Sequence, residues 1–287
     1  MSFYIPAYSD VFVKYLLGSE QNKDLLLSFI NSVLTDSGFA QIVNIEIKNP
    51  FNLKEFKVDK ESILDIKAVD ENGKQYDIEV QSTGDEKFKN RSLYYWAKLY
   101  VSQLKEKETF VSLRPAICIN VVNFNLFPEL TSFHNCFLLK EKENNEYVLT
   151  DHVMLHFLEL PKIKNENIIT KLEHWLYFLK HEGLEEDKMK ILIQDDKDLA
   201  KAHREYNTFT YDDKLREIYE QKFRYNLERN SDLETARLKG IEEGIEKGQI
   251  SAKLEDAQKM HELGMTTEQI LAVTGLSRKQ LQQAGIL

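Results

Sequence analysis

The sequence predicts an α/β domain followed by a helical region. Short runs in which apolar and polar residues alternate are typical of strands, and apolar residues at helical spacing lie before and between these runs. From Asn165 onward the apolar residues recur at helical spacing only. We therefore predict an αβββαβ core with a mixed sheet, followed by an α-helical C-terminal region.

The first helix is expected from Asp10 to about Leu34, and a second helix follows the third strand. The predicted strands are 42–48, 63–69, 76–81, 116–122, 136–139 and 152–160. Later helices are predicted at 168–179, 185–193, 198–206 and 212–227. This order divides the chain into an α/β core at 1–162, a helical extension at 163–230 and a helical tail at 231–287.

The composition is typical of a folded protein, because 287 residues with 42% hydrophobic residues can bury a sizeable core. Cys118 and Cys136 lie in apolar strand-like runs, which favours buried thiols in a reducing compartment over a disulfide or a metal site. The N-terminus lacks a basic segment followed by an apolar one, and apolar stretches such as 116–127 are too short to cross a bilayer. We expect a cytoplasmic protein with no membrane association.

Two neighbouring predicted strands carry acidic residues, and Asn72-Gly73 in the short link between them predicts a hairpin. Alternation places Asp65 on the polar face of one strand and Glu79 with Gln81 on the polar face of the other. Two carboxylates that lie together raise each other's pKa unless a cation lies between them. Oxygen ligands suit Mg²⁺ or Mn²⁺, so the pair is a candidate metal site. The alternative is the solvated face of an antiparallel hairpin.

Several short segments in a fixed order suggest a family. They are Ser9-Asp-Val-Phe-Val-Lys-Tyr15, the Asp65 strand, Glu79-Val80-Gln81, Arg91 with Tyr94-Tyr95, and the strand at 114–122. This ordered set resembles the PD-(D/E)XK nuclease superfamily, and within it the Rpn-like recombination-promoting nucleases, or nuclease family transposases. The resemblance covers the first half of the chain strongly. It implies a restriction-endonuclease-like core and a metal-dependent DNA endonuclease linked to recombination or transposition.

The resemblance also implies roles for individual residues. Asp65 and Glu79 would hold Mg²⁺ or Mn²⁺, with the backbone carbonyl of Val80 as a further ligand. Position 81 is usually Lys in the wider superfamily and is Gln here, as the Rpn-like group tends to have it. The Gln81 amide can orient water or phosphate but supplies no positive charge.

The first-helix motif would border the site, which makes Asp10 and Lys14 candidates to surround the acids. The alternative for this i,i+4 pair is a surface salt bridge on the first helix.

A formal net charge of −9 opposes nucleic-acid binding unless basic residues are concentrated locally. Helical spacing after the hairpin places a set of basic and aromatic residues within one narrow arc: Lys87, Arg91, Tyr94, Lys98 and Lys105. This arc adjoins the predicted metal site, so DNA phosphates are its expected partner. The alternative is the solvated face of an ordinary amphipathic helix.

The tail carries structural signals and no acid constellation. Gly240, Gly244 and Gly248 recur every four residues among Glu and Lys, which favours a close-packed soluble helix pair or a flexible connector. Thr266-Thr-Glu-Gln269 and Ser277-Arg-Lys-Gln280 are capping boxes, and the link between the two helices resembles a helix-turn-helix. We expect the tail to mediate homo-oligomer assembly or DNA delivery.

His134, His152 and His156 invite a metal interpretation. His152 and His156 are four residues apart on a predicted strand, which is too far for easy chelation, so we expect the three histidines to be structural.

The leading hypothesis is a Mg²⁺-dependent DNA endonuclease. The alternative is a nuclease-fold scaffold whose chemistry has lapsed and which binds DNA or self-associates. Gln81 in place of Lys favours the scaffold, whereas retention of Asp65 and Glu79 favours the enzyme.

Overall fold

The structure is a computed structural model that describes residues 4–51, 65–84, 87–164, 168–184 and 187–287. These residues form two compact units, Met1–Lys222 and Phe223–Leu287, which are considered separately below. The first part of the predicted strand at 63–69 lies outside the described residues.

The first unit contains a six-stranded mixed sheet in the order β1-β2-β3-β4-β6-β5. Its strands are β1 Ile45–Ile47, β2 Ile66–Asp70, β3 Gln75–Gln81, β4 Ala116–Val122, β5 His134–Leu138 and β6 Val153–Glu159. β4 pairs in parallel with β3 and β6, and the remaining pairs are antiparallel. Every residue of β4 is buried, as expected for the centre of a sheet covered on both faces.

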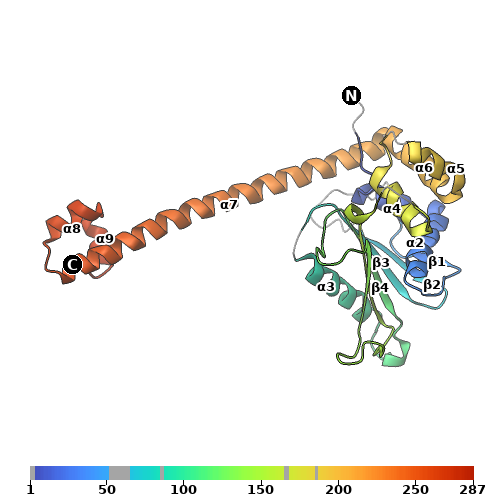
Figure 1. Cartoon of the computed structure of the whole chain (residues 1–287), viewed down its shortest axis with the longest axis horizontal. Coiled ribbons are helices and arrows are strands. Elements are labelled where there is room, and N and C mark those ends of the chain that lie inside the picture. The colour runs from blue at the N-terminus through green and yellow to red at the C-terminus, as the bar shows by residue number, and fades with distance from the viewer. Residues whose placement is uncertain (1–3, 52–64, 85–86, 165–167, 185–186) are drawn as a thin grey trace. The chain divides into compact units, whose positions relative to one another are not determined.

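Helices cover the two faces of the sheet unequally (Figure 1). α1 Asp10–Gly18, α2 Lys23–Asp36 and α4 Lys171–His181 share one large core with the inner residues of the strands. α3 Phe88–Val101 covers the opposite face, where Phe88 packs with Val122 and Phe157. α5 Asp187–Asp195 and α6 Lys197–Tyr211 add residues to the large core. The short 3-10 helices are η1 Glu20–Asn22, η2 Phe110–Ser112 and η3 Leu160–Lys162. The fold is therefore the predicted α/β architecture with a mixed sheet, followed by a helical C-terminal region.

The prediction of one helix from Asp10 to Leu34 was wrong, because the chain breaks at Ser19 between α1 and α2. Ser19 adopts an extended conformation, and its hydroxyl donates to the carbonyl oxygen of Tyr15. A serine hydroxyl that takes this carbonyl competes with continuation of the helix. At Gly18, a Cβ atom would lie 3.1 Å from Cδ of Lys14, so the small residue leaves room for the Lys14 stem.

The predicted hairpin is formed by β2 and β3 around Asn72-Gly73. Gly73 has a φ of 82°, a left-handed conformation that glycine adopts without strain. Asp70 Oδ1 accepts hydrogen bonds from the backbone N–H groups of Asn72 and Lys74, which closes the turn. The resulting register pairs Ile66 with Ile78.

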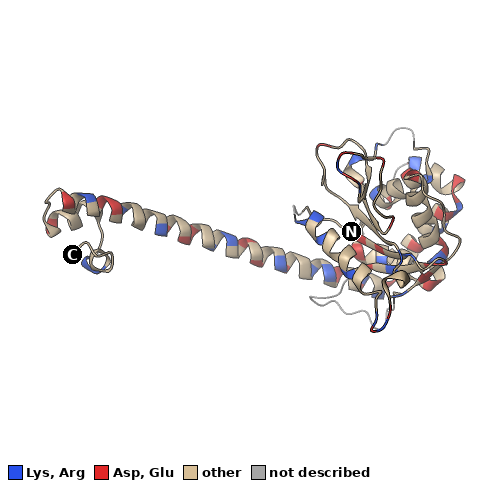
Figure 2. Ribbon diagram, turned by 90° about the horizontal axis from the view of Figure 1, so that it is seen from below, with Lys and Arg blue, Asp and Glu red and all other residues tan. Residues whose placement is uncertain are grey.

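The second unit contains most of α7 Asp213–Glu262, together with α8 Thr267–Thr274 and α9 Arg278–Gln283. The helix predicted at 212–227 therefore continues far beyond its expected end and includes the glycine series, with acidic and basic residues interspersed along it (Figure 2). Capping boxes at Thr266 and Ser277 start α8 and α9, and Gly275 ends α8 in a left-handed conformation. A small core joins these helices and comprises Ala257, Ile270, Leu276, Leu281 and Ile286. Across the described parts of the chain, no helix is long and apolar enough to span a membrane.

Candidate active site

Three acidic residues gather where β2 begins and β3 ends. Asp65 immediately precedes β2, and continuing the register by one pair places it opposite Glu79. Asp77 lies two residues before Glu79, on the strand face opposite the core residues Tyr76 and Ile78. Asp65 and Asp77 are only 8% and 5% exposed, so their charges lie largely away from water.

Asp77 is the most strongly perturbed of these acids. Its pKa is raised to about 8, mainly by burial and also by the charges of Asp65 and Glu79, while the Lys67 charge lowers it. The Lys67 ammonium lies 3.2 Å from Asp65 Oδ2. Among the described residues, Asp77 Oδ1 has no hydrogen-bond partner. The sequence analysis left Asp77 out of the site, although its position two residues before Glu79 on the same strand face was a usable signal.

Glu79 and Gln81 both contact Arg91 of α3. Arg91 Nη2 donates to Glu79 Oε1 over 3.1 Å and to Gln81 Oε1 over 2.6 Å. Burial raises the Glu79 pKa, and the Arg91 charge partly offsets this effect. Gln81 also donates from Nε2 to the hydroxyl of Thr83 over 3.0 Å. Arg91 was predicted to contact DNA, and in the structure its guanidinium lies against Glu79 and Gln81.

Lys14 of α1 contacts the main chain at Asp65, one of the three acids. Its Nζ donates to the carbonyl oxygens of Asn49 at 2.6 Å and Asp65 at 2.8 Å. Lys14 is 6% exposed, and burial lowers its pKa to about 8. The surface salt bridge considered for Asp10 and Lys14 is therefore wrong, because Lys14 is buried and holds main-chain oxygens.

Asn49 also binds the main chain at the start of β2, and this role was not predicted from the sequence. Its Nδ2 donates to the Asp65 carbonyl over 3.1 Å, while its Oδ1 accepts from the backbone N–H of Lys67 over 2.7 Å. The main chain at the start of β2 is thus fixed by side chains from two other segments.

Asp10 lies in different surroundings from the three acids. Its Oδ1 accepts from the backbone N–H of Val11, and its charge interacts with Lys222 and with Tyr219 of α7. Burial raises its pKa, and Lys222 opposes the change.

The predicted basic arc is only partly helical. Lys87 immediately precedes α3, and Tyr94 and Lys98 are exposed on it. Lys105 was wrongly placed on this arc, since α3 ends at Val101 and Lys105 lies in the following loop.

The donor set for a cation consists of Asp65, Glu79 and the neighbouring Asp77, with the Val80 carbonyl nearby. The Gln81 carbonyl accepts from Asn123 beyond β4, so alternation along β3 turns the Val80 carbonyl toward the β2 side. Within the described ranges, no three His, Cys, Asp or Glu side chains already converge as a metal site. Glu79 is engaged by Arg91 instead.

Comparison with known proteins adds one finding. A family model described as PD-(D/E)XK nuclease family transposase matches residues 7–236, a range that includes all six strands and the acid cluster. No curated protein and no solved structure matches the chain significantly.

Proposed function

The chain belongs to the PD-(D/E)XK nuclease family transposases, and we propose that it is a Mg²⁺-dependent endonuclease that hydrolyses DNA phosphodiester bonds in recombination or transposition. The observation that carries this proposal is the group of three acids where β2 begins and β3 ends, in which Asp65 and Asp77 are buried and Glu79 is half-buried. Acids kept out of water and close together raise each other's pKa, and a cation relieves that cost.

The residues present fit Mg²⁺ or Mn²⁺. The donors are oxygens, and the unpartnered Oδ1 of Asp77 among the described atoms is an acceptor next to the proposed ligands. Asp65 and Glu79 would hold the ion, together with the Val80 carbonyl. When bound, the ion would polarise the phosphate and lower the pKa of a water molecule.

The chain's own residues prepare this site. Lys14 and Asn49 hold the Asp65 carbonyl, which fixes the direction of the Asp65 side chain. Gln81 can orient a water molecule or a phosphate oxygen through its amide. Arg91 contacts only Oε1 of Glu79, which leaves Oε2 as the oxygen for a cation. The same guanidinium lies beside Gln81, where it can attract phosphate.

DNA is the proposed substrate and partner. Lys87, Tyr94 and Lys98 are exposed at or on α3, the same helix that carries Arg91 into the acid cluster. Cations at this position can neutralise phosphates close to the scissile bond in spite of the overall negative charge. Cys118 and Cys136 are free thiols, which fits the reducing cytoplasm as the proposed location.

Self-association through the tail is a further part of the proposal. The exposed apolar side chains of α7 include four that are exposed by 53%, 58%, 48% and 57%: Leu227, Leu238, Ile241 and Ile245. Helical spacing places them on one stripe. A second copy that covers this stripe would remove it from water and bring two nuclease units to one DNA.

The alternative is a nuclease-fold scaffold that binds DNA without cleaving it. The contact of Arg91 with both Glu79 and Gln81 favours it, because the guanidinium occupies the cation's side of these residues. A plasmid-nicking assay with and without Mg²⁺ separates the two functions. The endonuclease cleaves only with the ion and loses cleavage in Asp65→Ala, whereas the scaffold binds the plasmid and leaves it intact.

A further inference from the structure

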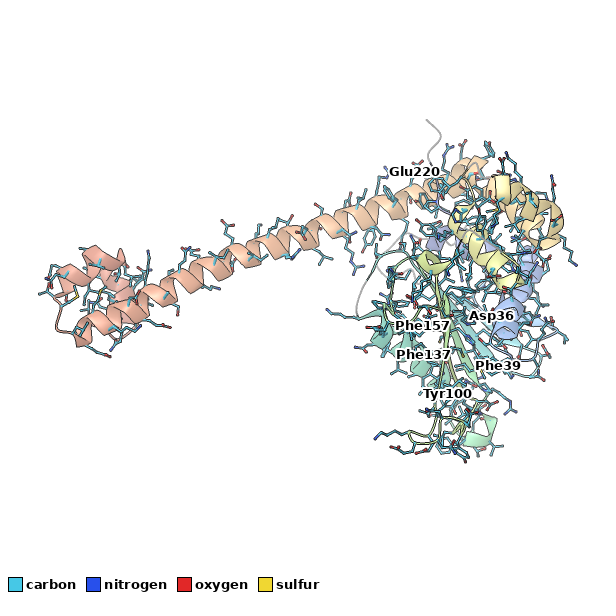
Figure 3. All side chains as sticks on the ribbon, viewed as in Figure 1. Asp36, Phe39, Tyr100, Phe137, Phe157 and Glu220 are labelled. Carbon is cyan, nitrogen blue, oxygen red and sulfur yellow. The ribbon has the colours of Figure 1, made fainter. Side chains whose placement is uncertain are left out.

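A second polar cluster lies on the face of the sheet opposite α3. His134 of β5 and His156 of β6 face each other, with Nε2 of His134 3.0 Å from Nδ1 of His156. Asp36 ends α2 and lies with Phe39 on this side of the sheet, away from Phe157 (Figure 3). The Phe39 ring packs edge-on against His156. None of these groups takes part in the proposed nuclease site.

The hydrogen bonds fix how the two imidazoles are arranged. Asp36 Oδ2 lies 2.6 Å from Nδ1 of His134, so that nitrogen donates to the carboxylate and Nε2 of His134 is left with a free lone pair. In the metal-free protein, Nδ1 of His156 donates to this lone pair. The proton of His156 can instead reside on its Nε2, which lies 3.9 Å from Cys136 Sγ, a weak acceptor. This shift leaves both facing nitrogens free, with no net loss of a proton.

The hydroxyl of Ser37 completes a triangle with the two nitrogens. Ser37 Oγ lies 3.3 Å from His134 Nε2 and 3.5 Å from His156 Nδ1. Ligands with bonds of ~2.1 Å are separated by about 3.0 Å at a right angle and about 3.4 Å at the tetrahedral angle. The three separations of 3.0, 3.3 and 3.5 Å thus match the edges of one coordination polyhedron.

We propose that His134, His156 and Ser37 form a transition-metal site that binds Zn²⁺, with Asp36 orienting His134. Imidazole nitrogens prefer Zn²⁺ over Mg²⁺, so this site and the acid cluster would select different ions. A carboxylate that accepts the other N–H of a ligating histidine is the usual support of such a site. No third His, Cys, Asp or Glu in the described residues joins the set, so water supplies the remaining ligands and the expected affinity is modest.

The bound ion would connect the end of α2 to the edge of the sheet. His134 is on β5, His156 is on β6, and Ser37 follows α2 directly. Because an ion that binds only the folded state stabilises it, Zn²⁺ should raise the melting temperature of the protein. This proposal does not depend on the nuclease function.

The test is calorimetric titration of the full chain with Zn²⁺ alone. An Asp65→Ala parent removes a proposed carboxylate ligand of the nuclease site. His152→Gln is the matched control, because His152 immediately precedes β6 and bonds Tyr100 of α3 instead. The parent and the control should bind one Zn²⁺ per chain and melt at a higher temperature with it. His134→Gln should bind at least about tenfold more weakly, and Asp36→Asn about tenfold more weakly.

Two results would overturn the proposal. One is a parent that binds no Zn²⁺ at micromolar concentrations, and the other is unchanged affinity in both His134→Gln and Asp36→Asn. If His134→Gln fails to fold, Asp36→Asn and Ser37→Ala still decide the matter, since both change groups at the partly exposed edge of the cluster.

Discussion

Arg91 of α3 donates a hydrogen bond to Glu79 of β3 over 3.1 Å, which joins a helix to the acid cluster of the sheet. The same nitrogen contacts Gln81, the position at which the wider superfamily usually carries Lys. The Arg91 guanidinium of α3 therefore supplies, beside position 81, a positive charge that β3 itself lacks. This contact determines how substitutions of Gln81 should change the nicking activity.

Gln81→Lys alone should lower Mg²⁺-dependent nicking by roughly tenfold or more, because two cations would then face each other. The double variant Gln81→Lys with Arg91→Gln should recover activity, since one positive charge is restored at the same point. Lys142→Gln in an exposed loop serves as the control for loss of a charge away from the site. Equal activity of the single and double variants would show that Arg91 does not supply this charge.

Charge removal at Lys87 and Lys98 should weaken DNA binding evenly across sequences. The slope of log affinity against log salt should fall by about one to two units, as expected for the loss of up to two phosphate contacts. Lys142→Gln, in an exposed loop, is the matched single-charge control. Filter binding over a salt series measures the slope, and an unchanged slope would assign these lysines to solubility alone.

Asp10→Asn should stabilise the protein at neutral and alkaline pH. Burial raises the Asp10 pKa in the folded state, so the contribution of Asp10 to stability is fully present below the unfolded value of 3.8 and is lost as pH rises through the folded value. The amide carries no charge to bury, so the variant should melt roughly 1–3 °C higher at pH 8 and nearly equally at pH 4. Glu46→Gln, which changes an exposed side chain on β1, is the control. A lower melting temperature of Asp10→Asn at pH 8 would mean that the Lys222 charge outweighs burial.

Ile241→Asp with Ile245→Asp should abolish self-association of the full chain, because carboxylates on the exposed stripe oppose its burial against a second copy. Glu243→Gln lies on the opposite side of α7 and should leave the assembly unchanged. Light scattering coupled to gel filtration gives the mass of each. A wild-type chain that is monomeric at high concentration would exclude this role for the stripe.

Local patterns were sufficient for part of the fold. The apolar run at 116–122, interrupted only by Asn120, predicted β4 with its observed bounds, because a strand buried on both faces is apolar along nearly its whole length. Asn72-Gly73 predicted the turn between β2 and β3, since Gly73 needs a left-handed conformation. The alternation of β3 likewise predicted that Glu79 and Gln81 share a face, and both contact Arg91.

Contacts between distant segments were not predictable in the same way. The Lys14 ammonium binds main-chain oxygens that lie 35 and 51 residues away, and no local spacing encodes such a contact. Arg91 has the helical position of a surface residue but turns inward, because the acids it meets are on another element. The end of α3 before Lys105 was missed because no Gly or Pro marks it.

The most direct test of the account is the rate of plasmid nicking by the purified full chain with Mg²⁺ and with a chelator. Asp65→Ala and Glu79→Ala are compared with the wild type, and Glu46→Gln is the matched carboxylate control on β1. The account predicts cleavage by the wild type and the control only with Mg²⁺, and a loss of at least about 100-fold in both site variants with folding and DNA binding retained. Cleavage at the wild-type rate by either Asp65→Ala or Glu79→Ala would contradict it.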